Sequence, residues 1–104
     1  MSFETIHWHD AIILGVIINP KSASLRLKID YPVNWEKNEY QHMEVVFSDA
    51  FGYQEHEGPF VGCPTILSAT MVPSGQFFLI RMETNAGHRE VGCSAVELLP
   101  CASS

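Results

Sequence analysis

Lysine and arginine are scarce in this sequence, which disfavours the classes of protein that depend on them. Only 6 residues are Lys or Arg, against 12 Asp or Glu, so the formal net charge at pH 7 is −6. Nucleic-acid binding relies on basic side chains that neutralise phosphates, and an acidic chain is repelled by them. We therefore expect no nucleic-acid partner.

The sequence also lacks the long apolar run that a membrane span requires. Its longest uncharged apolar stretch, residues 11–18, has the length of a strand, whereas a transmembrane helix needs about 20 residues. The first residues do not combine a basic segment with an apolar one, as a secretory signal would. We predict no membrane association and a cytoplasmic location.

Cysteine is sparse, and its spacing matches no known framework. The three cysteines, Cys63, Cys93 and Cys101, are odd in number and form no Cys-x-x-Cys pair, which disfavours both a disulfide framework and a structural zinc knuckle. Cys93 lies in an apolar strand pattern, so we expect a buried thiol. Cys63 would be reactive only if a histidine such as His56 came near it, and we expect an unreactive loop thiol.

Recognised catalytic motifs are missing as well. The chain has no Gly-x-Ser-x-Gly nucleophile motif and no glycine-rich phosphate or dinucleotide loop. Glu55-His56-Glu57 resembles an acid/base group, but in a polar segment we interpret it as solvated surface. We predict no catalytic residue and no cofactor, and the protein is not expected to be an enzyme.

What the sequence does contain is the period of β-strands. No segment keeps a helical period over ten or more residues. Residues 11–18 are apolar at both parities, which predicts a central strand covered on both faces. After Asn19-Pro20, a good turn starter, residues 23–30 alternate, and the two segments should form an antiparallel hairpin. Further strands are predicted at residues 42–49, 65–72, 76–83 and 89–98.

The connections between these strands follow from their turn residues. Pro32 should end the second strand, and a helical turn over residues 35–40, capped by Asn34, is left open. Residues 50–64 are expected to form an ordered irregular loop. Residues 85–87 suit a three-residue hairpin loop with Gly87 in the left-handed conformation. Because the apolar parity changes within residues 89–98, a bulge is predicted near Ser94 to Val96.

These elements predict one all-β or nearly all-β domain over residues 1–104, with a flexible tail at residues 99–104. We expect a single antiparallel sheet of about six strands, and the pattern leaves open a curved sheet, a small sandwich or a partly open barrel. The spare apolar faces could be buried within the chain or in a homodimer. The predicted core comprises Ile13, Val16, Leu27, Ile29, Val45, Phe47, Leu67, Phe78, Ile80, Val91 and Cys93.

The sharpest candidate for metal binding is the motif His7-Trp8-His9-Asp10. Imidazoles at i and i+2 of an extended segment point to the same side, with a carboxylate adjacent. A site needs three or four ligands, and His42, His56 and His88 lie in separate segments. We predict no metal site, with Asp10 and His9 satisfying backbone groups where the first strand starts. A metal-dependent enzyme that uses His7, His9 and Asp10 is the alternative hypothesis.

The negative charge is confined to one segment, which suggests a binding surface. Residues 30–57 hold seven acids and one base, whereas the remainder carries five of each sign. Aromatic residues alternate with these acids, and such side chains often anchor interfaces while the charges steer a basic partner. Alternatively, the aromatics pack on the sheet, as we expect for Trp35, and the acids only solvate it. The predicted partner-binding residues are Glu36, Glu39, Tyr40, Phe51, Tyr53, Glu55 and Glu57.

The segment Trp8-His9-Asp10-Ala11 is followed directly by an apolar strand. This opening is similar to that of one family among the small β-rich bacterial immunity-type proteins that neutralise polymorphic toxins. Phe47-Ser48-Asp49 and the later Gly87, Cys93 and Glu97-Leu98 continue the pattern, although residues 50–64 have no counterpart. The resemblance implies a non-catalytic protein whose partner is a toxin domain, and it supplies no binding residues.

Overall fold

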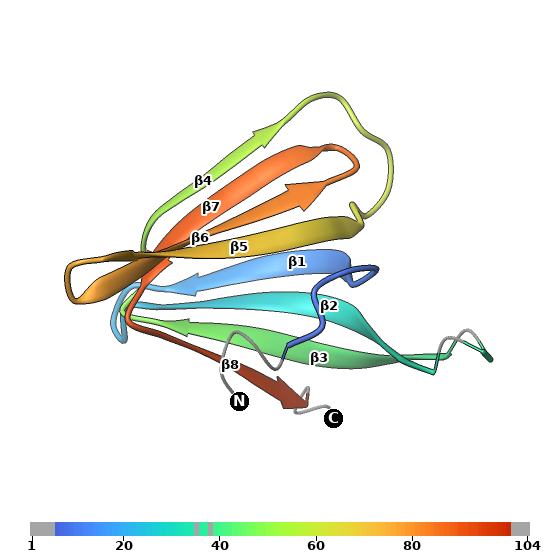
Figure 1. Cartoon of the computed structure of the whole chain (residues 1–104), viewed down its shortest axis with the longest axis horizontal. Coiled ribbons are helices and arrows are strands. Elements are labelled where there is room, and N and C mark those ends of the chain that lie inside the picture. Colours follow the sequence, from blue (N-terminus) through green and yellow to red (C-terminus); the bar gives the residue numbers. More distant parts are fainter. Residues whose placement is uncertain (1–5, 35, 38, 101–104) are drawn as a thin grey trace.

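A computed structural model of the chain describes residues 6–34, 36–37 and 39–100, which form an all-β domain (Figure 1). Within these residues the strands make two antiparallel four-stranded sheets rather than the single six-stranded sheet expected. The first sheet has the order β1-β2-β3-β8 and the second β4-β7-β6-β5. The strands are β1 (Ile12–Asn19), β2 (Ser24–Asn34), β3 (Glu39–Ser48), β4 (Phe51–Glu57), β5 (Ile66–Ser74), β6 (Phe77–Thr84), β7 (Gly87–Cys93) and β8 (Ala95–Pro100). No helix capable of crossing a membrane occurs in this described part.

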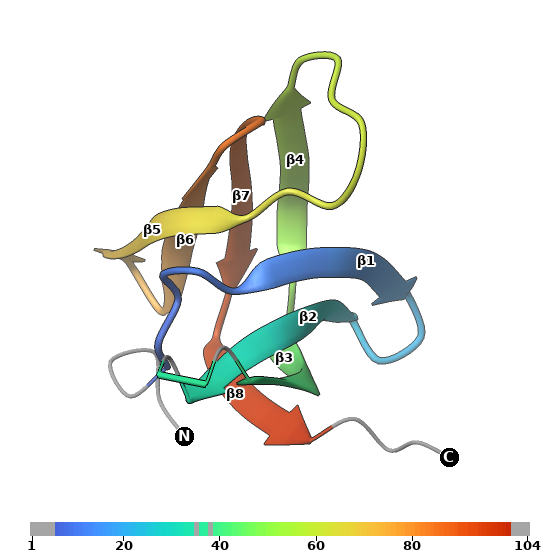
Figure 2. The ribbon, with the colours of Figure 1, turned by 90° about the vertical axis from the view of Figure 1, so that its right-hand side faces the viewer.

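Two strands pass from one sheet to the other at the same corner of the molecule (Figure 2). β3 leads into β4 through Asp49, whose φ of 53° is left-handed, and β7 leads into β8 through Ser94. The Ser94 N–H donates to the Ser48 carbonyl at 2.8 Å, and its hydroxyl donates to Asp49 Oδ2 at 2.6 Å. The bulge predicted near Ser94 is therefore a change of sheet, with Cys93 buried before it and Val96 buried after it.

The two sheets are also joined on their other side, where β1 meets the residues that precede β5. Ile12 forms an isolated antiparallel bridge with Thr65. The Asp10 N–H donates to the Ile66 carbonyl at 2.9 Å, and the Ile66 N–H donates to the Ala11 carbonyl at 2.8 Å. These bonds hold the segment before β1 in place through its backbone, where donors at a strand start need acceptors. The prediction assigned this role to the side chains of His9 and Asp10, which instead lie beside each other, with His9 Nδ1 3.1 Å from Asp10 Oδ2.

The core lies between the sheets and takes side chains from both of them. Of the predicted core residues, Ile13, Leu27, Ile29, Val45, Phe47, Ile80, Val91 and Cys93 are buried, and Val16 packs partly buried against them. Leu67 is exposed instead, because a register irregularity between Ile66 and Ser68 places Ile66 in the core. Phe78 is only half-buried because it pairs with Pro73 close to the β5–β6 turn.

The predicted first hairpin is confirmed, whereas three connections differ from expectation. β1 pairs with β2 from Ile12 opposite Asp30 to Asn19 opposite Ser24. β2 continues through Pro32, because at this point it has β3 on one side and no β1 partner on the other, where a missing N–H is tolerated. Trp35, placed in the possible helical turn, lies outside the described residues.

The other differences concern the segments around β4 and β7. The predicted loop at residues 50–64 contains a strand, β4, whose hydrogen bonds come from the distant β7. The β6–β7 turn has two residues, with Thr84 opposite Gly87, and Gly87 adopts a φ of 151° rather than the left-handed helical value. Leu99 and Pro100, expected in a flexible tail, pair with β3, and residues 101–104 lie outside the description.

The central position of Phe47 predicts a large effect of truncation. Phe47 is fully buried, so Phe47→Ala should lower the free energy of unfolding by about 3 to 5 kcal/mol. Phe78→Ala should cost only about 1 to 2 kcal/mol, since its side chain is only partly buried. Urea unfolding monitored by circular dichroism measures both values, and equal losses would contradict this placement of the core.

Candidate functional site

β4 carries polar side chains to both of its faces, and this divides the predicted binding residues. Side chains alternate along a strand, so Tyr53, Glu55 and Glu57 point toward the space between the sheets while Gln54 and His56 point away from it. Glu55-His56-Glu57 therefore does not act as one acid/base group. Its two carboxylates and its imidazole lie on opposite faces.

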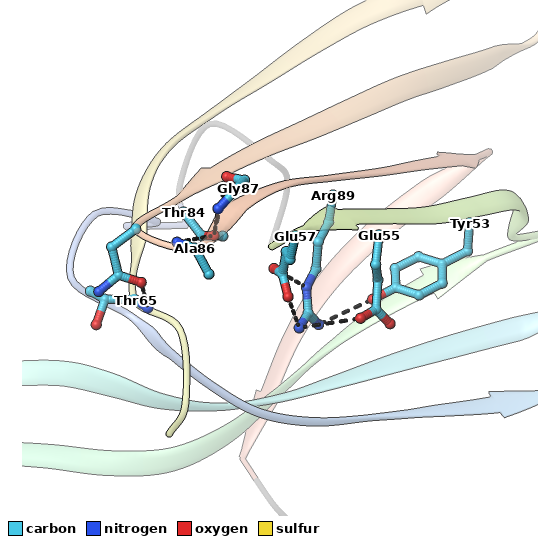
Figure 3. Close-up of polar contacts among 9 residues, drawn as sticks. Tyr53, Glu55, Glu57, Thr65, Thr84, Ala86, Gly87 and Arg89 are labelled. Carbon is cyan, nitrogen blue, oxygen red and sulfur yellow. Dashed lines mark hydrogen bonds and ion pairs between the residues drawn. The ribbon is translucent and has the colours of Figure 1, made fainter. Parts of the chain in front are cut away.

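A buried arginine organises the inner face of β4 (Figure 3). Arg89 of β7 is almost fully buried and donates to Glu57 through Nε at 2.8 Å and Nη2 at 3.1 Å. Its Nη1 donates to the Tyr53 hydroxyl at 3.1 Å, and Nη2 lies 3.5 Å from Glu55 Oε1. The Tyr53 hydroxyl donates in turn to Glu55 Oε2 at 3.0 Å. We call Tyr53, Glu55, Glu57 and Arg89 the arginine cluster.

Two members of the arginine cluster, Arg89 and Tyr53, have raised pKa values. Burial by itself would lower the pKa of the Arg89 guanidinium, but the hydrogen bonds to Glu57 and the neighbouring negative charges raise it above its ordinary value. Burial raises the pKa of the Tyr53 hydroxyl well above its usual range. The Arg89 charge acts to lower this pKa, and Glu55 acts to raise it. A cationic guanidinium and a neutral phenol suit a structural cluster with a net negative charge.

The arginine cluster borders a cleft of about 390 Å³ between the sheets. Residues 13–16 of β1 form one wall, residues 62–64 form another, and Glu55 and Arg89 contribute the polar lining. The exposed Cys63 also lines this cleft. His56 does not approach Cys63 from the inner side, because its ring stacks on His88 on the opposite face of β4. The pairing that would have made Cys63 a candidate nucleophile is thus not formed.

The outer face of the second sheet carries side chains in ordered rows across its strands. The pairing of β5, β6, β7 and β4 aligns one residue from each strand in every row. The first row is Val72, Leu79, Gly92 and Phe51; the second is Thr70, Arg81, Glu90 and Gln54; the third is Ser68, Glu83, His88 and His56. Along the strands the face changes from apolar to charged and then to a pair of histidines.

The apolar end of this face is exposed to solvent. Phe51, Val72, Phe77 and Leu79 are between 37% and 56% exposed, and we call them the apolar patch. The Phe51 ring lies over Gly92, where a Cβ would collide with it, and meets Phe77 edge-on at 5.3 Å between centroids. Aromatic side chains commonly cover a cross-strand glycine in this way. The ring positions are therefore fixed by neighbours within the sheet.

The structure separates the predicted partner-binding residues into three groups. Glu36, Glu39 and Tyr40 are exposed where β2 and β3 meet, at the far right of Figure 1. Phe51 belongs to the apolar patch. Tyr53, Glu55 and Glu57 belong to the arginine cluster, and the Glu57 side chain is only 15% exposed. Glu57 is thus a partner of Arg89 rather than the solvated acid expected from its sequence.

The motif around His7 does not form a three-ligand cluster. His9 Nδ1 lies 3.1 Å from Asp10 Oδ2, and the rings of His7 and His9 are 6.5 Å apart. In the described residues, the three potential metal ligands that converge are His56, His88 and Glu90. Trp8, between the two histidines, is buried in the core, whereas His7 and His9 on either side of it are exposed. The burial of Trp8 therefore holds the motif against the core.

Sequence reasoning overlooked Arg89, His88 and Glu90 as site residues. All three lie on β7, and the pairing of β4 with β7 brings Arg89 to Glu57 and His88 to His56, over 30 residues apart in the chain. Glu90 lies beside His88 on the same strand. The available signal was the set of polar residues at alternating positions in residues 53–57, which is typical of a strand with two polar faces. The glycines and prolines beside that segment concealed it.

The buried arginine predicts a strong dependence of stability on its pairing. Arg89→Met should lower the free energy of unfolding by about 3 to 5 kcal/mol, because Glu57 is left without its cation. Adding Glu57→Gln should recover part of this loss. The matched control is Arg81→Met, whose pair with Glu83 is about half-exposed and should cost less than about 1 kcal/mol. Equal losses in urea unfolding would contradict a structural role for Arg89.

The raised pKa of Tyr53 predicts a loss of stability in alkaline solution. Above the ordinary tyrosine pKa of about 10, the unfolded chain releases this proton while the folded protein retains it, so stability falls as the pH rises. Tyr53→Phe removes this contribution, and its unfolding free energy should fall less between about pH 9 and pH 11. Tyr40→Phe, an exposed control, should retain the wild-type pH dependence. Identical slopes for all three proteins would refute the assignment.

Comparison with known proteins shows the fold and no more. No protein-family model matches this sequence, and no curated protein matches it. The structure is similar to the crystal structure of an uncharacterized protein from Neisseria gonorrhoeae, with a TM-score of 0.66 at 9% sequence identity. The similarity covers 91% of this chain and 95% of that chain. At so low an identity the likeness establishes a shared architecture and carries no statement about activity.

Proposed function

We propose that this protein is a non-catalytic binding module for a basic protein partner, of the immunity type that its short motifs resemble. The observation that carries the proposal is the apolar patch on the outer face of the second sheet. Contiguous exposed apolar side chains are unusual on a protein without a partner and commonly mark interfaces. Two of its four members are phenylalanines, which supply large contact areas at interface centres.

The surroundings of the apolar patch support a partner that is itself positively charged. The adjoining rows contain the exposed or half-exposed Glu83 and Glu90 and one cation, Arg81. The whole chain has a net charge of −6, so its field attracts basic proteins and repels acidic ones. In this arrangement the apolar patch supplies desolvated contact area, and the acids set orientation and association rate.

The predicted residues around the connection from β2 to β3 form a second, independent element of this proposal. Glu36 is exposed in the turn between these strands, and Glu39 and Tyr40 are exposed at the start of β3, apart from the apolar patch. We propose that they contribute long-range attraction rather than the central contact. The arginine cluster is a structural element in this proposal and does not contact the partner. The hydrogen bonds from the Arg89 guanidinium to Glu57 and Tyr53 hold β4 on β7.

A partner-capture experiment with matched surface variants tests this proposal. The patch variant carries Leu79→Ser and Val72→Ser, and the control carries Leu67→Ser, which is 46% exposed against 47% for Leu79. We expect a basic protein to be retained by the wild type and the control, and its affinity for the patch variant to fall at least about tenfold. Its association rate should also fall as salt is raised.

Three outcomes would count against the proposal. A partner that binds the patch variant as tightly as wild type would exclude the apolar patch, and association indifferent to salt would exclude electrostatic steering. The third outcome is measured by sedimentation equilibrium: a wild-type dimer that becomes monomeric in the patch variant would mean that a second copy covers this surface.

The double variant Glu36→Lys with Glu39→Lys should slow association of the partner while leaving its dissociation nearly unchanged.

A further inference from the structure

Two histidines and a glutamate meet at the polar end of the second sheet's outer face. His56 of β4 stands directly opposite His88 of β7, and their rings stack with centroids 4.7 Å apart and planes at 25°. Glu90 follows two residues after His88 on the same face, with Oε1 3.5 Å from His88 Nε2. One potential ligand atom from each side chain lies within 4.8 Å of the other two.

We propose that His56, His88 and Glu90 form a binding site for a late first-row divalent cation, with Zn²⁺ as the best fit. Two imidazoles and one carboxylate are a donor set that suits zinc, nickel and copper, whereas magnesium and calcium prefer oxygen ligands alone. Three protein ligands leave a coordination position for water or for a group from another molecule. The site is distinct from the apolar patch and does not depend on the proposed partner.

The geometry needs only a small adjustment to hold an ion. Zinc bonds to nitrogen and oxygen are about 2 Å long, so tetrahedral ligand atoms lie roughly 3.3 Å apart. The three potential ligand atoms lie within 4.8 Å of one another, and His56 is exposed enough to turn. A rotation that brings each ligand atom inward by about 1 Å completes the set.

The backbone beneath the three side chains is firmly fixed. Register pairing holds His56 against His88, and Gly87 lies so close to the His56 carbonyl that any added Cβ would collide with it. Gln54 contributes a second support, because its Oε1 lies 2.8 Å from His56 Nε2 and orients the ring. Groups that orient a metal-binding imidazole in this way increase metal affinity. A bound cation would tie the edge strand β4 to β7.

The neighbouring charges favour a cation at this position. On β6, Glu83 lies opposite His88 in the strand pairing. Arg81, whose charge would repel a cation, forms an ion pair with Glu83, with Nε 3.3 Å from Oε2. β7 contributes the charge of Glu90, while Gln54 on β4 and Ser68 on β5 are neutral. The two carboxylates outweigh the single arginine.

Calorimetric titration of the untagged, chelator-treated protein with zinc chloride tests the site. We expect a stoichiometry of one ion per chain and an upward shift in Tm of at least about 4 °C at saturation. His56→Ala and His88→Ala should each raise the zinc Kd by at least about tenfold. Glu90→Gln, which preserves the shape of the side chain, should also weaken binding.

A histidine elsewhere on the surface supplies the control. His42→Ala removes an exposed imidazole that pairs with Asp30 at 2.9 Å on the first sheet, and the chain keeps four of its five histidines. Its zinc affinity should equal that of the wild type. The proposal is overturned if zinc does not bind, or if the His42, His56 and His88 variants lose affinity equally. Circular dichroism of His56→Ala, an exposed position, separates loss of the site from loss of the fold.

Discussion

The arrangement of this protein depends on the corner where two strands leave one sheet and enter the other. At this corner the Ser94 backbone and hydroxyl bind Ser48 and Asp49, so that β3 to β4 and β7 to β8 turn together. The turn reverses the face that each strand presents, which is why Cys93 and Val96 both reach the core although they differ in parity. Without this reversal, β4 and β7 could not close the core over the first sheet. They would also lack the separate inner and outer faces on which the candidate sites lie.

Neighbouring residues of β4 and β7 lie on opposite faces of the second sheet and have different electrostatic roles. On the inner face, Arg89 is shielded from water, and its bonds to Glu57 and Tyr53 satisfy groups whose burial would otherwise be costly. On the outer face, His56 and His88 remain accessible beside Glu90. One additional residue of register shift between β4 and β7 would exchange these faces. The arginine cluster therefore specifies the register that brings the two histidines together, and the inner and outer sites depend on each other through the backbone alone.

Local patterns predicted those features that depend on neighbouring residues in the chain. The β1–β2 hairpin followed from an Asn-Pro turn between apolar runs, and most of the core followed from alternation, as Leu27 and Phe47 illustrate. Leu67 was misplaced because an irregularity in strand pairing is invisible to a simple period of two. β4 was missed because its stabilising partner, β7, is distant in sequence, and its own residues are mostly polar. The pairing of Glu57 with Arg89 and of His56 with His88 follows from that same long-range contact, so neither site could be found before the fold was known.

Two glycines on β7 explain how so polar a strand as β4 is held in place. Gly87 lets the His56 carbonyl approach where a Cβ would collide, and Gly92 leaves room for the Phe51 ring. These two points lie at opposite ends of the β4–β7 pairing, one beside the histidine pair and the other beneath the apolar patch. A strand fixed at both ends, with Arg89 bound to Tyr53 and Glu57 on its inner side, has little freedom to slip. The apolar patch and the histidine pair thus lie on strands whose register is fixed, which would lower the entropic cost of the binding proposed at each place.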